Sequence, residues 1–106
     1  SPVWAEALAS TMPEQTTLTR AFSGRAGRGI ATDYVRASAR PEAPAPAAYP
    51  VQRGMTRVMR EAAVRTGDLR RMQAWAGQSA WMARAEPAAE IMARLWHETT
   101  DVLPLR

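Results

Sequence analysis

The sequence predicts a mostly α-helical chain with a single strand and too little large apolar material to form a core of its own. Alanine supplies 22 of the 106 residues, whereas Leu, Ile, Val and Phe together supply only 15. Four Trp and six Met provide much of the bulky apolar surface, and both residue types are common at interfaces as well as in cores. We therefore expect the chain to pack against a larger body.

The first helix is predicted to begin at Ser1 and Pro2, because a capping hydroxyl precedes the residue best suited to a first helical turn. It should end before Pro13. Its apolar face comprises Val3, Trp4, Ala7 and Leu8. Residues 16–22 (TTLTRAF) are rich in Thr and alternate in polarity, which is typical of a strand. A lone strand leaves its backbone groups unpaired, so this orphan strand should join a sheet from elsewhere.

The middle of the chain is predicted to be irregular. Residues 23–29 (SGRAGRG) carry three glycines and two arginines, which predicts a mobile loop with exposed backbone N–H groups. A short helix should follow over residues 32–39, with Tyr34 and Val35 as its apolar contacts. Four prolines, separated mostly by alanine, make residues 40–50 a stiff, extended connector.

The second half is predicted to be helical. A helix over 51–66 ends at Gly67, a shorter helix spans 68–72, and residues 73–79 interrupt the pattern. The apolar stripe of the first of these comprises Val51, Met55, Val58, Met59 and Ala62. Pro87 opens a final helix, whose inward residues are Ile91, Met92, Leu95 and Trp96.

Composition excludes several functional classes. The absence of cysteine excludes disulfides and thiolate metal sites, and it fits a cytoplasmic protein. No apolar run approaches the roughly 18 residues of a membrane span, and no leader peptide opens the chain. All 14 basic residues are arginine, and they are interleaved along the chain with ten carboxylates. This dispersion does not predict a nucleic-acid-binding face.

The sequence predicts neither a catalytic residue nor a metal site in this chain. The single histidine, His97, lies beside a differently facing Glu98, and its position fits a favourable cation near a helix C-terminus. The SGRAGRG segment could bind an anion through backbone amides and Arg25 or Arg28. It lacks the Lys-Ser/Thr of a Walker loop and the glycine spacing of a dinucleotide fingerprint, and a flexible turn explains it equally.

Two further groups are candidates for a binding site. Tyr49, Arg53 and Arg57 are spaced four residues apart, so a helix would align a phenol and two guanidinium groups that could hold a small anion. Periodicity alone favours a solvated stripe. Gly77 and Gln78 stand in a Trp-Ala-Gly-Gln turn that could border a flavin or substrate edge, although an ordinary helix connection would look the same.

Four segments in this order resemble the C-terminal part of the nitronate monooxygenase family, also called 2-nitropropane dioxygenases. They are TTLTRAFSGRAGRGI (16–30), AYPVQRGMTRVMREAA (48–63), WAGQSA (75–80) and EPAAEIMARL (86–95). The resemblance implies the C-terminal part of an FMN-binding (β/α)₈ TIM barrel. It also implies an enzyme that oxidises alkyl nitronates with O₂ to a carbonyl compound and nitrite.

The resemblance also implies what the chain lacks. The family's FMN-phosphate loops and catalytic histidine lie upstream, and His97 does not match that base. The chain alone should therefore be inactive and should need the missing N-terminal barrel portion. Residues 1–40 are expected to form an excursion over the active site, 41–50 a connector, and 51–106 helices that pack on the barrel. Six side chains are expected to face the barrel: Trp4, Phe22, Met55, Met59, Ile91 and Trp96.

Site residues follow from the same resemblance. Tyr49 matches a tyrosine near the substrate, and Arg53 and Arg57 stand where relatives often have Tyr and Lys. The remaining candidates are the loop residues at the active-site mouth, Ser23, Gly24 and Arg25, and the cofactor-proximal turn residues, Gly77 and Gln78.

An alternative hypothesis is a small Arg-rich helical module that binds nucleic acid or an acidic partner. It predicts binding that weakens steeply as the salt concentration rises. The nitronate monooxygenase hypothesis predicts no nucleic-acid partner and no membrane partner.

Overall fold

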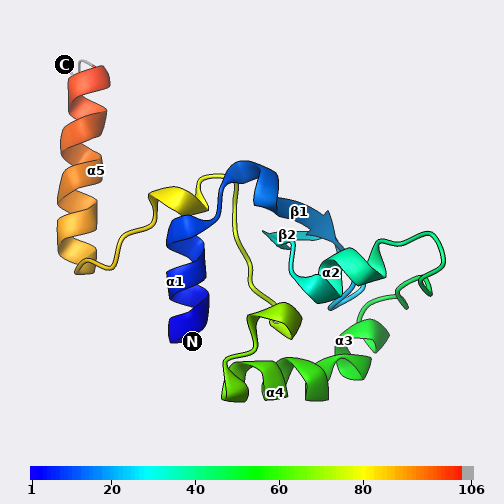
Figure 1. Ribbon diagram of the computed structural model, residues 1–106. Helices are drawn as coiled ribbons and strands as arrows, with labels where there is room; N and C mark the ends of the chain where they lie inside the picture. Colours follow the sequence, from blue (N-terminus) through cyan, green and yellow to red (C-terminus); the bar gives the residue numbers. More distant parts are fainter. Residues whose placement is uncertain (104–106) are drawn as a thin grey trace.

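The computed structural model describes residues 1–103 and shows an elongated molecule from which one helix stands apart (Figure 1). Its principal extents are 54 × 28 × 24 Å. The helices and strands are α1 (Pro2–Ser10), β1 (Thr16–Thr19), β2 (Gly27–Ile30), α2 (Asp33–Ser38), α3 (Val51–Met55), α4 (Arg57–Thr66) and α5 (Ala88–Val102). Three 3₁₀ turns are η1 (Pro13–Gln15), η2 (Leu69–Arg71) and η3 (Ala80–Met82). Within residues 1–103, no helix is both long and apolar enough to cross a membrane.

The strand is not an orphan, so that prediction is wrong. β1 pairs with β2 in an antiparallel sheet, with Thr16 opposite Ile30 and Thr19 opposite Gly27. Residues 27–29 of the predicted loop therefore belong to β2, and the loop ends at residue 26. A third segment extends this pairing through a single bridge between Gly29 and Trp75. The backbone N–H of Ile30 donates to Ala74 O at 2.9 Å, and that of Ala76 donates to Arg28 O at 3.3 Å.

Two glycines of β2 are required by the close approach of the Trp75 segment. A Cβ atom at Gly29 would lie 2.8 Å from Ala74 O, and one at Gly27 would lie 2.3 Å from the ring of Trp75. Glycine in a strand commonly marks such an approach. The indole N–H of Trp4 donates to Trp75 O at 3.1 Å. Trp4, which was expected to face the barrel, thus has a hydrogen-bond partner within this chain.

A small core is formed by the segments that follow β1 and η2, with one residue each from α2 and α4. Four of the seven buried apolar residues within 1–103 are alanines, and the larger ones are Phe22, Val35 and Met72. The ring of Phe22 packs on Tyr34 at a centroid distance of 5.1 Å. Because Phe22 is only 3 % exposed, the expectation that it faces a barrel outside the chain is wrong.

Several element boundaries are confirmed. α1 begins after Ser1 and ends before Pro13, although the Ser1 hydroxyl makes no capping hydrogen bond. α2 is capped by the side chain of Thr32, which accepts a hydrogen bond from the backbone N–H of Val35. Gly67 ends α4 with φ = 67°, in the left-handed region that glycine tolerates. Asp68 then caps the turn η2 by accepting a hydrogen bond from the backbone N–H of Arg70.

The apolar stripe predicted for helix 51–66 is exposed in most of its members. Val51, Met55 and Val58 are 59 %, 71 % and 73 % exposed. The helix is also divided at Thr56, where ψ is −2°. The buried residues on α3 and α4 are instead Gln52 and Ala63, together with Thr56 between them.

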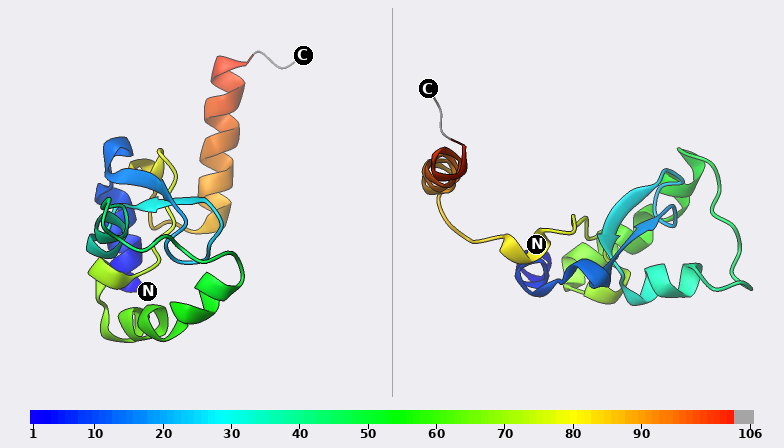
Figure 2. Two further views of the ribbon diagram at one scale, coloured as in Figure 1. Left: turned by 90° about the vertical axis from the view of Figure 1, so that its right-hand side faces the viewer. Right: turned by 90° about the horizontal axis from the view of Figure 1, so that it is seen from above.

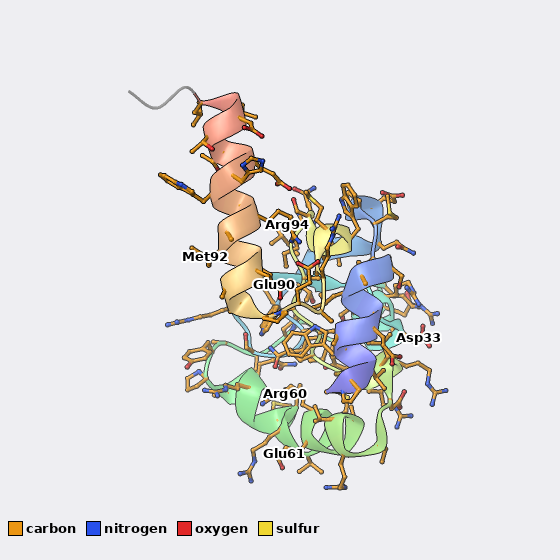
Figure 3. All side chains as sticks on the ribbon, turned by 90° about the vertical axis from the view of Figure 1, so that its left-hand side faces the viewer. Asp33, Arg60, Glu61, Glu90, Met92 and Arg94 are labelled. Carbon is orange, nitrogen blue, oxygen red and sulfur yellow. The ribbon has the colours of Figure 1, made fainter. Side chains whose placement is uncertain are left out.

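α5 forms over the range that the sequence predicts, but the described chain covers none of its faces completely. None of its residues is buried, and Met92 and Trp96 are 65 % and 64 % exposed. The helix is joined to the rest of the molecule by an extended segment (Figure 2). Its polar side carries Glu90 and Arg94, whereas Met92 points the opposite way (Figure 3). Arg94 forms an ion pair with Glu86 in the segment before the helix.

Candidate functional site

The loop between β1 and β2 is built around Gly24. The backbone N–H of Gly24 donates to Arg20 O at 2.8 Å, which closes the turn after β1. Gly24 has φ = 87°, a conformation that side-chain-bearing residues rarely adopt. The hydroxyl of Ser23 accepts a hydrogen bond from the backbone N–H of Arg25 at 3.2 Å. These contacts fix the direction in which the Arg25 side chain leaves the loop.

This loop lies directly against the end of the proline-rich connector. A Cβ atom at Gly24 would lie 2.5 Å from both Ala47 O and Tyr49 N. The guanidinium of Arg25 sits over the ring of Tyr49, 4.2 Å from its centroid. Such a cation–π contact contributes about 0.5–1 kcal/mol at an exposed site. The structure thus brings Tyr49 to the consecutive residues Ser23, Gly24 and Arg25, from which it is distant in sequence.

Buried polar side chains hold the backbone immediately before the loop. The amide of Gln52 donates to Ala21 O at 2.7 Å, and the hydroxyl of Thr56 donates to Phe22 O at 2.6 Å. The phenol of Tyr34 also donates to Ala21 O, at 3.1 Å. Burial raises the pKa of Tyr34, and a hydrogen bond with Gln52 partly offsets this effect, so the phenol stays protonated as a donor.

Arg53 and Arg57 are not aligned with Tyr49 on one continuous helix. Tyr49 precedes α3, Arg53 lies within it, and Arg57 is the first residue of α4. The carbonyl oxygen of Arg53, which a continuous helix would pair with the N–H of Arg57, accepts from Arg60 Nη2 at 3.0 Å. Both Arg53 and Arg57 are exposed, so their charges face solvent.

Gly77 and Gln78 lie just beyond the Trp75 segment and are exposed. A Cβ atom at Gly77 would have no neighbour within 4 Å among the residues of the structure, so the space above it is open. Their link to the Arg25 loop is indirect, through the contact of the Trp75 ring with Gly27. His97 is on α5, where its Nε2 lies 3.5 Å from Asp101, and both side chains are exposed.

Sequence reasoning did not select Gln52, Thr56 or Trp75, although Trp75 stands in the WAGQSA segment that carries the resemblance. Gln52 and Thr56 are also four residues apart, so the same spacing that singled out Tyr49, Arg53 and Arg57 describes a neighbouring stripe. Both stripes are polar, so polarity alone did not show which of them is buried and which faces solvent. The only available signal was the pair of glycines that admit Trp75, since glycine inside a strand indicates a close backbone or ring contact.

The structure brings together one guanidinium group and one phenol, those of Arg25 and Tyr49. Arg53 and Arg57 present their guanidinium groups to solvent on α3 and α4. Guanidinium groups form strong, charge-assisted hydrogen bonds with planar oxyanions. The described residues around this loop supply no histidine for proton transfer, because His97 lies on the separate helix α5.

Comparisons with known proteins agree on one family. The family model described as nitronate monooxygenase matches residues 2–98. A nitronate monooxygenase of Paraburkholderia phytofirmans is 38 % identical over 92 residues, which cover 87 % of this chain and 25 % of that protein. A probable nitronate monooxygenase of Staphylococcus aureus is 31 % identical over 98 residues, covering 92 % of this chain and 27 % of that protein.

A solved structure is similar as well. The nitroalkane oxidase of Streptomyces ansochromogenes matches with a TM-score of 0.82 and 36 % identity, over 93 % of this chain and 28 % of that protein. The chain therefore spans about a quarter of the length of the curated relatives that it matches.

Proposed function

Because this chain belongs to the nitronate monooxygenase family of oxidoreductases, we propose that it is the C-terminal part of an FMN-dependent nitronate monooxygenase. The complete protein would oxidise alkyl nitronates with O₂ to a carbonyl compound and nitrite. The main support for this proposal is the packing of Gly24 and Arg25 against Tyr49. This packing places segments 16–30 and 48–63, both of which resemble the family, in direct contact.

The proposed substrate has a charge opposite to that of the arginines near Tyr49 in the sequence. A nitronate is a planar anion, and Arg53 and Arg57 present cationic groups on the helices that follow Tyr49. We assign Tyr49, Arg53 and Arg57, with Ser23, Gly24 and Arg25, to the border of the substrate site. In this assignment the residues bind and orient the anion, and none of them acts as the catalytic base.

The remaining candidates, Gly77 and Gln78, suit the edge of an FMN site, but they could not form the whole site. Gly77 leaves open space above its α-carbon, and the exposed amide of Gln78 is able both to donate and to accept a hydrogen bond. We assign Gly77 and Gln78 to the edge of the flavin. When bound, FMN supplies the redox chemistry that this chain's side chains lack. Its phosphate would be held upstream, in the proposed (β/α)₈ barrel.

The upstream portion is also the proposed partner of α5. The helix exposes an apolar stripe whose members are Met92, Leu95, Trp96 and Val102. Exposed apolar surface of this kind is typical of a face that another part of the protein covers. We propose that the barrel covers it, and that this chain without the barrel is inactive.

The test is to purify the complete protein that carries this chain and to supply propyl-2-nitronate. We expect a yellow protein with flavin absorbance that consumes O₂ and releases nitrite. This chain alone should show neither property. A colourless complete protein that releases no nitrite would contradict the proposal.

Tyr49→Phe tests the substrate assignment in the same protein. The change keeps the ring under Arg25 and removes only the hydroxyl. We expect the KM for nitronate to rise roughly three- to tenfold, as for the loss of one hydrogen bond, with little change in kcat. Thr66→Val, on the exposed end of α4, is the control. An unchanged KM would remove Tyr49 from the substrate site.

Family membership favours the enzyme over the alternative of a nucleic-acid-binding module, and some of the arginines are engaged in ion pairs. Arg36 pairs with Asp33, and Arg70 pairs with Asp68 at 2.9 Å. Electrostatic binding to phosphates requires arginines that are free and gathered on one face.

A further inference from the structure

The side of α3 and α4 that faces the molecule carries a polar stripe. Gln52, Thr56 and Arg60 are spaced four residues apart. Gln52 and Thr56 are only 9 % and 6 % exposed, and Arg60 is half-buried. Helices usually present apolar residues at such positions. Buried polar groups are costly unless they are hydrogen-bonded, so the partners of this stripe indicate what it does.

Gln52 bridges the two segments that meet at the candidate site. Its Nε2 donates to Ala21 O at 2.7 Å, and its Oε1 accepts from the backbone N–H of Ala47 at 3.0 Å. Ala21 lies just before the Ser23–Arg25 loop, and Ala47 lies just before Tyr49. One side chain thus fixes both sides of the contact between Arg25 and Tyr49.

Thr56 and Arg60 extend this bridge to the third segment. The hydroxyl of Thr56 donates to Phe22 O at 2.6 Å and accepts from Arg60 Nε at 3.2 Å. Arg60 Nη1 donates to Gln73 Oε1 at 3.3 Å, and Nη2 donates to Arg53 O at 3.0 Å. Within residues 1–103, the guanidinium of Arg60 makes no ion pair and serves only these neutral oxygens.

We propose that Gln52, Thr56 and Arg60 are positioning residues, which hold the Ser23–Arg25 loop, Tyr49 and the Gln73–Gln78 segment in one arrangement. Their partners lie just before the Ser23–Arg25 loop, just before Tyr49, on α3 and at the start of the Gln73–Gln78 segment. The stripe acts through those segments, and no member of it contacts substrate in this assignment. The catalytic consequence rests on the proposed function, whereas the structural consequence does not.

The structural arm of the test measures amide hydrogen exchange in the complete protein. Thr56→Val keeps the shape of the side chain and removes the hydroxyl, whereas Thr56→Ser retains it. We expect exchange in residues 20–26 to accelerate at least about fivefold in Thr56→Val and in Gln52→Met, with wild-type rates in Thr56→Ser. Arg60→Met should accelerate exchange in residues 73–79. Residues 88–102 of α5 serve as the internal reference.

Thr66→Val is the matched control, because its hydroxyl bonds only to Ala62 O within its own helix. It should leave the exchange of residues 20–26 unchanged. If Thr56→Val accelerates exchange equally in α5, or leaves the loop unchanged, the positioning role is overturned. Gln52→Met and Arg60→Met test the same stripe at other contacts. If one variant does not fold, the others still test the positioning role.

The catalytic arm measures nitronate turnover in the same variants. Thr56→Val and Gln52→Met should raise the KM roughly three- to tenfold, and Thr56→Ser should restore it. If the unmodified protein does not oxidise nitronates, the proposed function fails while the exchange result still decides the positioning role. If the exchange changes are confined to the loop but the KM of an active enzyme is unchanged, the catalytic part of the inference is wrong.

Discussion

At the scale of single residues, Gly24 is the position with the least freedom to change. It combines a positive φ with a backbone contact that leaves no space for a side chain. The two constraints have different origins, because φ is set by the turn after β1 and the contact by the connector at 47–49. Both must be satisfied for Arg25 to reach the ring of Tyr49.

Gly24→Ala is therefore expected to lower the free energy of unfolding by about 1–3 kcal/mol. It should also separate Arg25 from Tyr49. Urea denaturation of the complete protein measures the first effect. Gly54→Ala is the control, since Gly54 is exposed on α3 and a Cβ atom there would meet nothing within 4 Å. We expect Gly54→Ala to stabilise α3 by about 0.5–1 kcal/mol. Equal effects of the two changes would contradict this account.

The sequence allowed the site residues to be proposed but not the way in which they meet. Spacing grouped Tyr49 with Arg53 and Arg57, whereas the structure groups Tyr49 with Arg25. The reason is that the helix begins after Tyr49 and divides at Thr56, where side chains bond to backbone carbonyls. Local periodicity contains no information about such long-range partners.

At the scale of elements, β2 shows why the sheet was missed. Its sequence, Gly-Arg-Gly-Ile, contains two residues that intrinsically disfavour strands. Glycine is needed there because the Trp75 segment approaches the strand closely, so the tertiary contact overrides the local preference. α1 and α5 were predicted well, since Pro2 and Pro87 are local signals, and α2 lies within the predicted range of 32–39.

A double-mutant cycle tests the contact between β2 and Trp75. Gly27→Ala should reduce the free energy of unfolding by about 1–3 kcal/mol, because the added methyl group would overlap the indole ring. In a Trp75→Leu background the ring is absent, and the cost of Gly27→Ala should fall below about 1 kcal/mol. Thermal or urea denaturation of the four proteins provides the measurement. Additive costs would show that the ring does not determine the need for glycine.

At the scale of the whole molecule, α5 shows how incomplete the packing of the described chain is. The helix is predicted correctly from Pro87 and from its apolar spacing, yet its apolar side remains exposed. The exposure of this side fits the low content of large aliphatic residues, because residues outside α5 form their small core from alanine and backbone contacts. The apolar stripe of α5 is then available to the proposed barrel.

Trp96→Glu tests this arrangement in the complete protein. Under the proposal that the barrel covers Trp96, the change should lower the free energy of unfolding by about 3 kcal/mol or more. His97→Gln lies on the polar side of the same helix and should change it by less than about 0.5 kcal/mol. Urea denaturation compares the two. A Trp96→Glu protein as stable as His97→Gln would show that the side carrying Trp96 is solvated in the complete protein.

The pairing of β2 with residues 74–76 also has a consequence during synthesis. β1 and β2 are close in sequence, whereas Ala74, which pairs with Ile30, follows on the order of forty residues later. At about 5–20 residues per second, the ribosome needs about 2–9 s to add that length. During this interval the outer edge of β2 is open to pairing with other nascent chains. Glycine disfavours strands and Arg28 is charged, so we expect that edge to be a poor template for pairing before Trp75 reaches it.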